Sequence, residues 1–343
     1  ADAFPVNQPV LVSDINKALV DIGATGTLAD ALTAIYDQAT PVVVIVRVAE
    51  GEGDTAAADT LANIIGSAAA KTGVYALLGA ETTLGVRPRI LGVPGFGSQT
   101  VTAALVTVAQ KLRAFAYAGC DTAATIAEAV TYREQFAARE LMLIWPDVST
   151  GDAVARALGL RARLDEEQGW HKSLSNVAIN GVTGLSEPIF FDLQDASSDA
   201  GVLNGASITT IVNRNGYRFW GNRTCSEDPL FAFETAVRTA QVLRDTIAEG
   251  LLWAVDKPLH PSLARDILET INNAFRQMKA QGRIIDGKAW LDPALNTQDS
   301  VAAGQLHIDY DFTPVPPLER LGLQQRITDR YLADFADQVN GAA

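Results

Sequence analysis

The first two-thirds of the chain alternates short apolar runs with helical stretches, and this order restricts the fold more than any other feature. The run PVVVIVRV at 41–48 is continuous and β-branched, which is typical of a strand covered on both faces. Strands that alternate with helices pair in parallel through right-handed crossovers. We therefore expect an α/β fold with an open, mostly parallel sheet flanked by helices. Further strands are expected at 73–78, 87–95, 114–119 and 140–146, and helices at 55–71, 100–112 and 122–138.

The segment ITTIVNRNGYRFWGNRT at 208–224 predicts a hairpin at the end of this α/β region. Its central Asn-Gly pair is a strong signal for a tight turn between two extended runs. We expect its aromatic side chains to pack against a neighbouring helix and its arginines to pair with carboxylates of the same or another chain. We interpret the hairpin as a structural junction with the last third of the chain, formed by Gly216, Arg218, Trp220 and Arg223.

The last third has a different pattern, which favours a separate α+β domain at 226–343. Two helices are expected at 229–255 and 260–283, the first beginning at an Asp228-Pro229 pair, with strands at 284–291 and 304–313. Ile267, Ile271, Ala274, Phe275 and Met278 have the helical spacing of a buried stripe. Basic residues gather near the end of the second helix, where they either complement the helix dipole or form an interaction site; they are Arg276, Lys279 and Arg283.

The C-terminal segment after the proline-rich turn is ambiguous, because its apolar residues fit both a strand and a helix. We expect a strand to about Asp329 followed by a short helix, within an arm at about 318–343. A strand at the end of a chain, after a proline turn, is well placed to pair with the sheet edge of a neighbour. The side chains expected to make this contact are Leu323, Ile327 and Tyr331.

The composition excludes several classes of function. With 40 acidic and 27 basic residues, the net charge of −13 opposes broad contact with a phosphate backbone, so the hairpin arginines are expected to have protein partners. The sequence has neither an apolar run of about 18 residues nor a signal-peptide pattern. Cys120 and Cys225 are far apart and are expected to be reduced, buried thiols.

An enzyme or a small-molecule binding protein is the alternative, since ligands of α/β sheets bind beyond the carboxyl ends of strands. The stretch GVPGFGSQ around Gly95 lies at such an end, but it matches no nucleotide-binding motif, and a Pro-Gly turn explains it. His171, His260 and His307 lack partners at metal-ligand spacing. Asp309 and Asp311 are best explained as a solvated strand face. We therefore expect no catalytic, cofactor-binding or metal-binding residues.

Several blocks of the sequence closely resemble the tail sheath proteins of contractile phages, in particular P2-like sheaths and R-type pyocin sheaths. The most specific are NRNGYRFWGNRTCSEDPLFAFETAVRTAQVL and IDYDFTPVPPLE; WAVDKP, QRITDRYLADF, FPVNQPVLVSD, GTLADALTAIYDQATPVVVIVRV and GVTGLSEPIFFDLQD agree with the same family. The resemblance covers nearly the whole chain. It implies a structural protein of a virion tail or a phage-tail-like particle, made in the bacterial cytoplasm.

The resemblance also implies an assembly and its partners. Family members stack as six-subunit rings around a rigid tube, and the sheath then shortens to drive the tube through a cell envelope without nucleotide hydrolysis. The partners would be other copies of the chain, the tail tube protein, and the baseplate and tail terminator proteins, with no direct nucleic acid and no membrane insertion. Residues 1–225 would be the outer domain and 226–343 the inner, tube-facing domain. Relative to the family pattern the chain starts after an N-terminal arm strand, so we expect it to be mainly monomeric.

Overall fold

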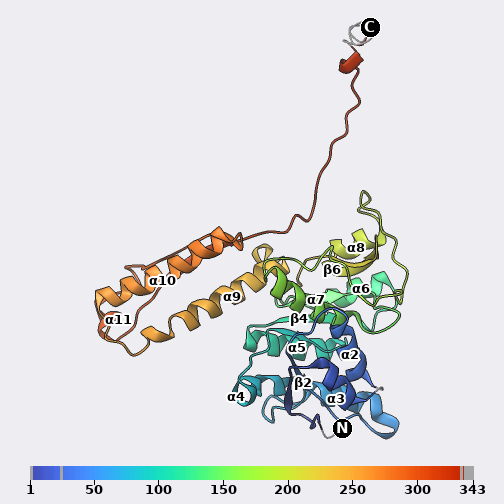
Figure 1. Ribbon diagram of the computed structural model, residues 1–343, viewed down its shortest axis with the longest axis horizontal. Coiled ribbons are helices and arrows are strands. Elements are labelled where there is room, and N and C mark those ends of the chain that lie inside the picture. The colour runs from blue at the N-terminus through green and yellow to red at the C-terminus, as the bar shows by residue number, and fades with distance from the viewer. Residues whose placement is uncertain (1–2, 24–25, 333–334, 336–343) are drawn as a thin grey trace.

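The computed structural model describes residues 3–23, 26–332 and 335. Figure 1 shows an α/β region, a lobe of two long helices that projects from one side of it, and a C-terminal tail that extends away from both. The chain therefore has the α/β region and the following α+β region that the sequence predicts.

The central sheet has five strands in the order β3-β4-β5-β6-β7. Neighbouring strands from β3 to β6 are parallel, and β7 closes the sheet as an antiparallel edge strand. The bounds are Ile90–Gly92 (β3), Phe115–Gly119 (β4), Leu141–Ile144 (β5), Ile208–Asn213 (β6) and Tyr217–Trp220 (β7). Every residue of β4 and β5 is buried, which explains why these strands are continuous apolar runs. The predicted open, mostly parallel sheet is confirmed.

Helices cover both faces of this sheet and fill two cores. On one face lie α5 (Gln99–Leu112), which packs on β4, and α6 (Ile126–Arg133) and α8 (Asp199–Gly205), which pack on β6; the core that they share includes Ala116 and Ala118 of β4. On the other face α7 (Ala153–Glu167) packs on Phe115 and Tyr117 of the same strand. The alternation of small and large side chains follows from the period of two along a strand.

The run at 41–48 forms a strand, but in a different sheet from the one expected. β1 (Pro9–Val12), α1 (Ile15–Ile22), α2 (Thr27–Tyr36) and β2 (Val43–Val46) form a small unit in which β2 pairs antiparallel with β1. This unit has its own core, which includes Ala155 of α7. The prediction that 41–48 belongs to the parallel sheet is therefore wrong, because its strand partner lies at the start of the chain.

The prediction of a strand at 73–78 is also wrong, because residues Gly73–Gly79 form a 3₁₀ helix, η2. Gly73 has a φ of +58°, and its Cα lies so close to Ile64 that an added Cβ would be 2.4 Å from that residue's carbonyl oxygen. A 3₁₀ helix has three residues per turn, and η2 uses it to place apolar side chains in the core on the α5 side of the sheet. It does so without pairing to any strand of the central sheet. Before and after η2 come η1 (Gly53–Thr55), α3 (Ala56–Ile65) and α4 (Ala80–Leu84).

The predicted hairpin is present as β6 and β7, in the register Asn213 with Tyr217. Its turn places Asn215 at φ +54° and Gly216 at φ +97°, which are conformations that these two residue types accept readily. Phe219 of β7 is fully buried in the core that includes Val237 of the following helix, as the sequence predicts.

The last third forms two long helices and a two-stranded sheet. After η3 (Pro229–Phe231), which Asp228 caps, come α9 (Glu234–Gly250), η4 (Leu252–Ala254), α10 (Pro261–Ala280), β8 (Ile284–Trp290), α11 (Gln298–Ala302) and β9 (Asp309–Pro314). The apolar stripe of α10 buries Ile267, Ile271, Phe275 and Met278 against Ile284 and Ala289 of β8. The predicted helices and strands of this region exist, with ends shifted by a few residues.

The segment after β9 is extended but is not a strand as far as the chain is described. A 3₁₀ turn, η5 (Arg330–Leu332), lies in it, and residues 318–330 are exposed. The expected strand to Asp329 is absent because no second strand is present to form a ladder with it. The end of the expected arm, at 336–343, lies outside the described residues.

Candidate assembly site

The sheet of β8 and β9 is a small antiparallel pair with α10 packed on β8. Among the described residues each of these strands has a single strand partner. A two-stranded sheet is marginal in stability and presents main-chain donors and acceptors along its outer edges. This sheet is therefore a place where a further strand gains hydrogen bonds.

One edge of this sheet is partly occupied by a side chain. Asn272 of α10 donates to the carbonyl oxygen of Ala289 at 3.1 Å and accepts from its N–H at 2.9 Å. The amide thus takes the place of a partner strand at Ala289. Beside it lies an open groove of about 670 Å³, lined by Asn272, Arg276, Asp286, Gly287, Lys288, Asp311, Phe312 and Thr313. The edge of β8 is thus already occupied at Ala289.

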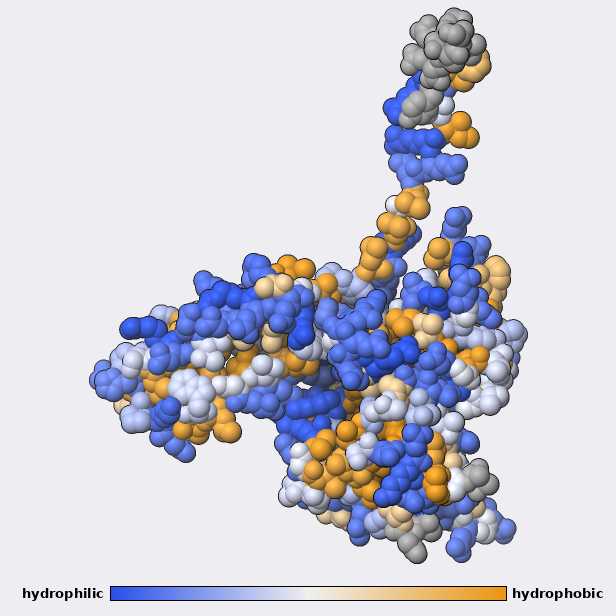
Figure 2. Space-filling view, viewed as in Figure 1, coloured by the Kyte–Doolittle hydropathy of each residue, from blue (hydrophilic) through white to orange (hydrophobic). Residues whose placement is uncertain are grey.

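The C-terminal tail exposes apolar side chains that a folded chain ordinarily buries. The exposed fractions are 86% for Leu323 and 98% for Ile327. Figure 2 shows such hydrophobic residues spaced along the projecting tail between hydrophilic ones. The side chain of Tyr331, the third residue predicted for the arm contact, lies outside the described part. An exposed apolar row on an extended segment indicates a surface that is covered in an assembly.

The three basic residues predicted at the end of α10 do not form one patch. Arg276 pairs with Glu269 and Lys279 with Asp286, each at 2.5 Å and each more than half exposed. Donation from Lys279 holds the pKa of the Asp286 carboxyl below its usual range. Arg283 instead places its guanidinium over the ring of Trp170, 4.8 Å from the ring centroid. Two of the three positive charges are thus balanced within the chain.

The hairpin arginines have different kinds of partner. Arg218 donates to the carbonyl oxygens of Arg214 at 3.0 Å and Asn176 at 3.2 Å, so its partners within this chain are main-chain carbonyls. Its pairing with a carboxylate of another chain stays a prediction. Main-chain carbonyls of the neighbouring loop satisfy it because they lie within reach of β7. Trp220 packs edge-on against Phe191 at a centroid distance of 4.9 Å.

Arg223, in contrast, has a carboxylate partner. Its Nε and Nη2 atoms donate to the two carboxylate oxygens of Glu319 at 2.6 and 2.7 Å. Glu319 lies in the segment that leads from β9 into the tail, so this ion pair joins the hairpin region to the root of the tail.

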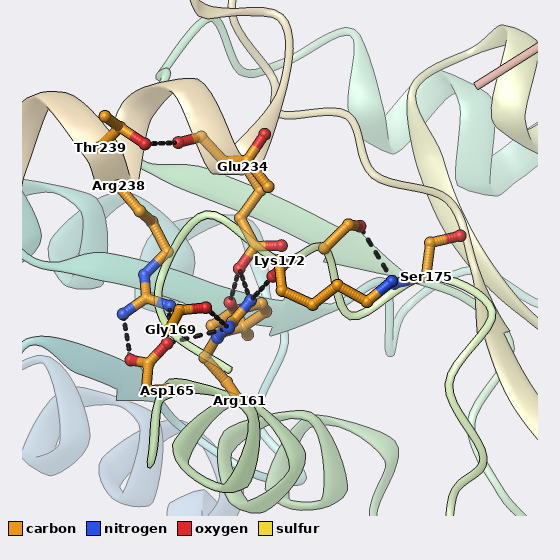
Figure 3. A network of polar contacts seen from close by, with 11 residues as sticks. Arg161, Asp165, Gly169, Lys172, Ser175, Glu234, Arg238 and Thr239 are labelled. Atoms are coloured by element: carbon orange, nitrogen blue, oxygen red, sulfur yellow. Dashed lines mark hydrogen bonds and ion pairs between the residues drawn. The ribbon is translucent and has the colours of Figure 1, made fainter. Parts of the chain in front are cut away.

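Sequence reasoning missed a row of polar residues on α9, which the structure turns toward the α/β region. Glu234, Arg238, Gln241 and Asp245 lie at intervals of four, three and four, which is one face of a helix. That spacing is a signal in the sequence that could have identified them, but it was not used. Figure 3 shows the first two, with their partners on α7.

The first turn of α9 is joined to the α/β region by buried charges. Glu234 accepts hydrogen bonds from Tyr117 and, at 3.3 Å, from Arg161, and all three side chains are fully buried. Arg238 makes a bidentate pair with Asp165, in which the Nη1 bond is 2.7 Å long. Burial alone would raise the pKa of Asp165, but Arg238 and Arg161 outweigh burial and hold it below its usual range. Burial, reinforced by Glu234, raises the pKa of Tyr117 well above 10.

Later turns of α9 are attached to the amino ends of the sheet strands. Gln241 donates to the carbonyl oxygen of Ala114 at 2.9 Å. Asp245 accepts from Arg89 at 2.5 Å and from Arg113 at 2.6 Å. Because Leu243 of the same helix lies in the core with α10, α9 belongs to both regions of the molecule.

Arg161 also fixes the loop after α7. It donates to the carbonyl oxygens of Lys172 at 2.6 Å and Gly169 at 3.3 Å (Figure 3). Between them, Trp170 packs on the core of α9, α10 and β8. Arg161 thus bonds both to α9, through Glu234, and to the loop that carries Trp170.

The strand end near Gly95 has three carboxyl groups, of which Asp121 is exposed and Asp147 and Asp152 are partly buried, but no catalytic arrangement. Asp121, Asp147 and Asp152 each accept main-chain N–H groups of the surrounding loops. Burial raises the pKa of all three, that of Asp152 to about 7. In the described ranges no group of three or more His, Cys, Asp or Glu side chains is arranged to hold a metal ion. These carboxyl groups order the loops at the carboxyl edge of the sheet.

Two further features concern the cysteines and the helices. Cys120 and Cys225 are free and buried. No helix within the described residues combines the length and the apolar character needed to cross a bilayer.

Comparison with known proteins decides the family. The phage tail sheath protein central domain matches residues 52–225, and the phage tail sheath C-terminal domain matches residues 226–328. The chain belongs to the phage tail sheath family. It is 51% identical to the tail sheath protein of Escherichia phage P2, over 99% of this chain and 90% of that protein. It is 45% identical to the major tail sheath protein of Serratia phage KSP20, over 100% and 90% of the two chains.

Solved structures show the same fold at low sequence identity. The sheath complex of an extracellular contractile injection system in its contracted state matches with a TM-score of 0.73 and 17% identity, over 96% of this chain and 89% of that one. The contracted helical sheath of the anti-feeding prophage matches with a TM-score of 0.72 and 18% identity, over 94% and 88%. As a member of the tail sheath family, the chain is a structural component of a phage or phage-like tail and not an enzyme.

Proposed function

We propose that the chain polymerises with copies of itself, as stacked six-subunit rings around a tail tube, and that the sheath shortens to drive the tube through a cell envelope. The observation that carries this proposal is an exposed, extended tail on a subunit that also presents an open two-stranded sheet. A donor and an acceptor on every copy generate an open, repeating assembly. The names of the relatives above, and a matching chain from the anti-feeding prophage baseplate, support the proposal.

We infer that the tail at 318–343 is the donor and the β8–β9 sheet of a neighbour is the acceptor. Added strands gain affinity from main-chain hydrogen bonds and specificity from alternate side chains. Leu323 and Ile327, and Tyr331 further on, are the side chains expected to be buried in the contact. Because Asn272 occupies main-chain groups of Ala289, the edge of β9 is the inferred acceptor.

Replacing Ile327 with proline tests this donor role. Proline removes a main-chain N–H and blocks ladder pairing, so Ile327→Pro is expected to abolish long sheaths in electron micrographs. Ile327→Val is the matched control, because it keeps both the N–H and the β-branched shape. Ile327 is 98% exposed, so the circular dichroism and unfolding midpoint of the separate subunit should not change. Full-length sheaths from the proline variant would show that the segment is not a donor strand.

The remaining partners follow from this assembly. We propose residues 1–225 as the outer domain and 226–343 as the inner domain that faces the tube. Arg276, Lys279 and Arg283 are the proposed contacts with acidic groups of the tail tube protein. The baseplate and tail terminator proteins would bind the two ends of the stack.

A further inference from the structure

The root of the tail is attached to the α/β region by an ion pair between the end of the hairpin segment and the segment after the proline turn. Arg223 follows the hairpin, and Glu319 follows the proline turn, 96 positions further along the chain. Both bonds of the fork are short, at 2.6 and 2.7 Å. Bidentate pairing of this kind fixes the relative orientation of two groups as well as their distance.

Arg223 is itself held in place by the body of the subunit. The main chain of Arg223 forms an antiparallel β-bridge with Phe233. The guanidinium of Arg223 lies over the Phe233 ring, 5.4 Å from the ring centroid. The next two residues are bonded as well, with Thr224 donating to Ala232 at 2.8 Å and Cys225 to Leu141 of β5 at 2.9 Å. Glu319 is therefore anchored to a rigid point.

The segment between β9 and Glu319 is short and stiff. β9 ends at Pro314, and Pro316 and Pro317 follow it. Prolines fix φ and favour an extended path, so the segment acts as a semi-rigid spacer. The tail extends away from the body (Figure 1), and Leu321, two residues after Glu319, is 69% exposed. The ion pair thus lies where the tail leaves the body.

We propose that the Arg223–Glu319 ion pair sets the direction in which the tail leaves the subunit and opens when a subunit turns relative to its neighbour. The opening step rests on the proposed role of the tail as a donor strand. Arg223 and Glu319 are 39% and 35% exposed, so solvent weakens their attraction. A pair of this exposure shifts an orientational equilibrium by about two- to fivefold. It favours one direction of the tail, and turning of the subunit breaks it easily.

The direction of the tail is measurable in the unassembled chain by electron–electron resonance between two spin labels. Thr131→Cys on α6 and Gln324→Cys on the tail provide exposed attachment sites. The native thiols stay unlabelled, since burial raises the pKa of Cys225 to about 12 and that of Cys120 well above its usual range. Dilution with excess unlabelled chain restricts the signal to distances within one copy.

We expect one dominant distance in the parent chain and a broader, shifted distribution in Glu319→Gln. Arg223→Glu alone should broaden it as well, and the double reversal Arg223→Glu with Glu319→Arg should restore most of the original distribution. Arg320→Gln, which changes the adjacent charge, is the control and should have no effect. Raising the salt concentration should broaden the parent distribution and leave that of Glu319→Gln unchanged, because exposed ion pairs are screened.

Identical distance distributions in the parent and Glu319→Gln would overturn the proposal. So would a distribution in the double reversal that stays as broad as in Arg223→Glu alone. These outcomes are independent of polymerisation. If Ile327→Pro still builds sheaths while Glu319→Gln broadens the distribution, the ion pair directs the tail and the donor-strand role fails.

Discussion

Arg161 is the residue on which the buried connection between the two regions most depends. Its guanidinium forms ion pairs with Glu234 and Asp165 and donates to two loop carbonyls, and its side chain is fully buried. Arg161→Met would leave the Glu234 carboxylate buried without its charge partner. Removing one member of a buried ion pair costs about 3–5 kcal/mol, so we expect a loss of that size in the free energy of unfolding.

Urea unfolding of the separate subunit would measure this loss. Arg163→Met, on the same helix but partly exposed and bonded to Ala178, is the matched control and should cost much less. Equal losses in the two variants would contradict the role given to Arg161.

At the same scale, Asp152 makes the stability of the subunit depend on pH. Burial raises its pKa to about 7 in the folded chain, against about 3.9 in an unfolded one. Its stabilising contribution is therefore complete below pH 4 and is lost as the pH rises to 7, since the folded state keeps the proton longer.

Asp152→Asn should remove this pH dependence. Asparagine caps a helix about as well as aspartate, so the bond to the N–H of Ala155 is retained. We expect the variant to gain stability relative to the parent between pH 4 and 7, by roughly 1–3 kcal/mol in all. Measuring the free energy of unfolding at a series of pH values tests this gain. If that free energy varied with pH in the same way in the two proteins, the prediction would be refuted.

Among the elements, the β6–β7 hairpin offers a comparison of two glycines with positive φ. An added Cβ at Gly216 meets nothing within 4 Å, whereas at Gly221 it would lie 2.8 Å from Cα of Thr209 in β6. Gly216→Ala should therefore cost only the conformational strain, about 1–2 kcal/mol. Gly221→Ala adds a clash with main chain, about 1–3 kcal/mol more. In thermal unfolding the midpoint temperature of Gly221→Ala should be lower than that of Gly216→Ala. The reverse order would contradict the packing described for β7.

At the scale of the whole molecule, the basic end of α10 is predicted to contact the tube. Exposed pairs are worth about 0–1 kcal/mol each, so they can break on contraction and still add up over many subunits. Reversing Arg276 and Lys279 to glutamate should yield sheaths without tube, or sheaths that shorten early, in electron micrographs.

Because Arg276 already pairs with Glu269, a control must separate folding from tube contact. The swap Arg276→Glu with Glu269→Arg restores the pair within the chain and should unfold like the parent. Normal extended tails from the Arg276 and Lys279 double reversal would exclude these residues as tube contacts.

The sequence alone determined the features that depend on near neighbours along the chain. The buried strands at 114–119 and 140–146, the apolar stripe of α10 and the Asn-Gly turn are each specified by side chains a few positions apart. The parallel sheet followed from their order, because a crossover helix permits few other arrangements.

The tertiary structure decided everything that depends on a distant partner. The run at 41–48 joins β1 instead of the central sheet, and 73–78 forms a 3₁₀ helix, since a short apolar run is compatible with either geometry until its neighbours are placed. The spacing of Glu234 and Arg238 was visible, but Arg161 and Asp165 stand 73 positions before them. The described part of the tail has no strand in a single chain, because a strand exists only when it is hydrogen-bonded to a second one. Contacts between residues far apart in the sequence depend on the packing of the whole chain, which no local pattern encodes.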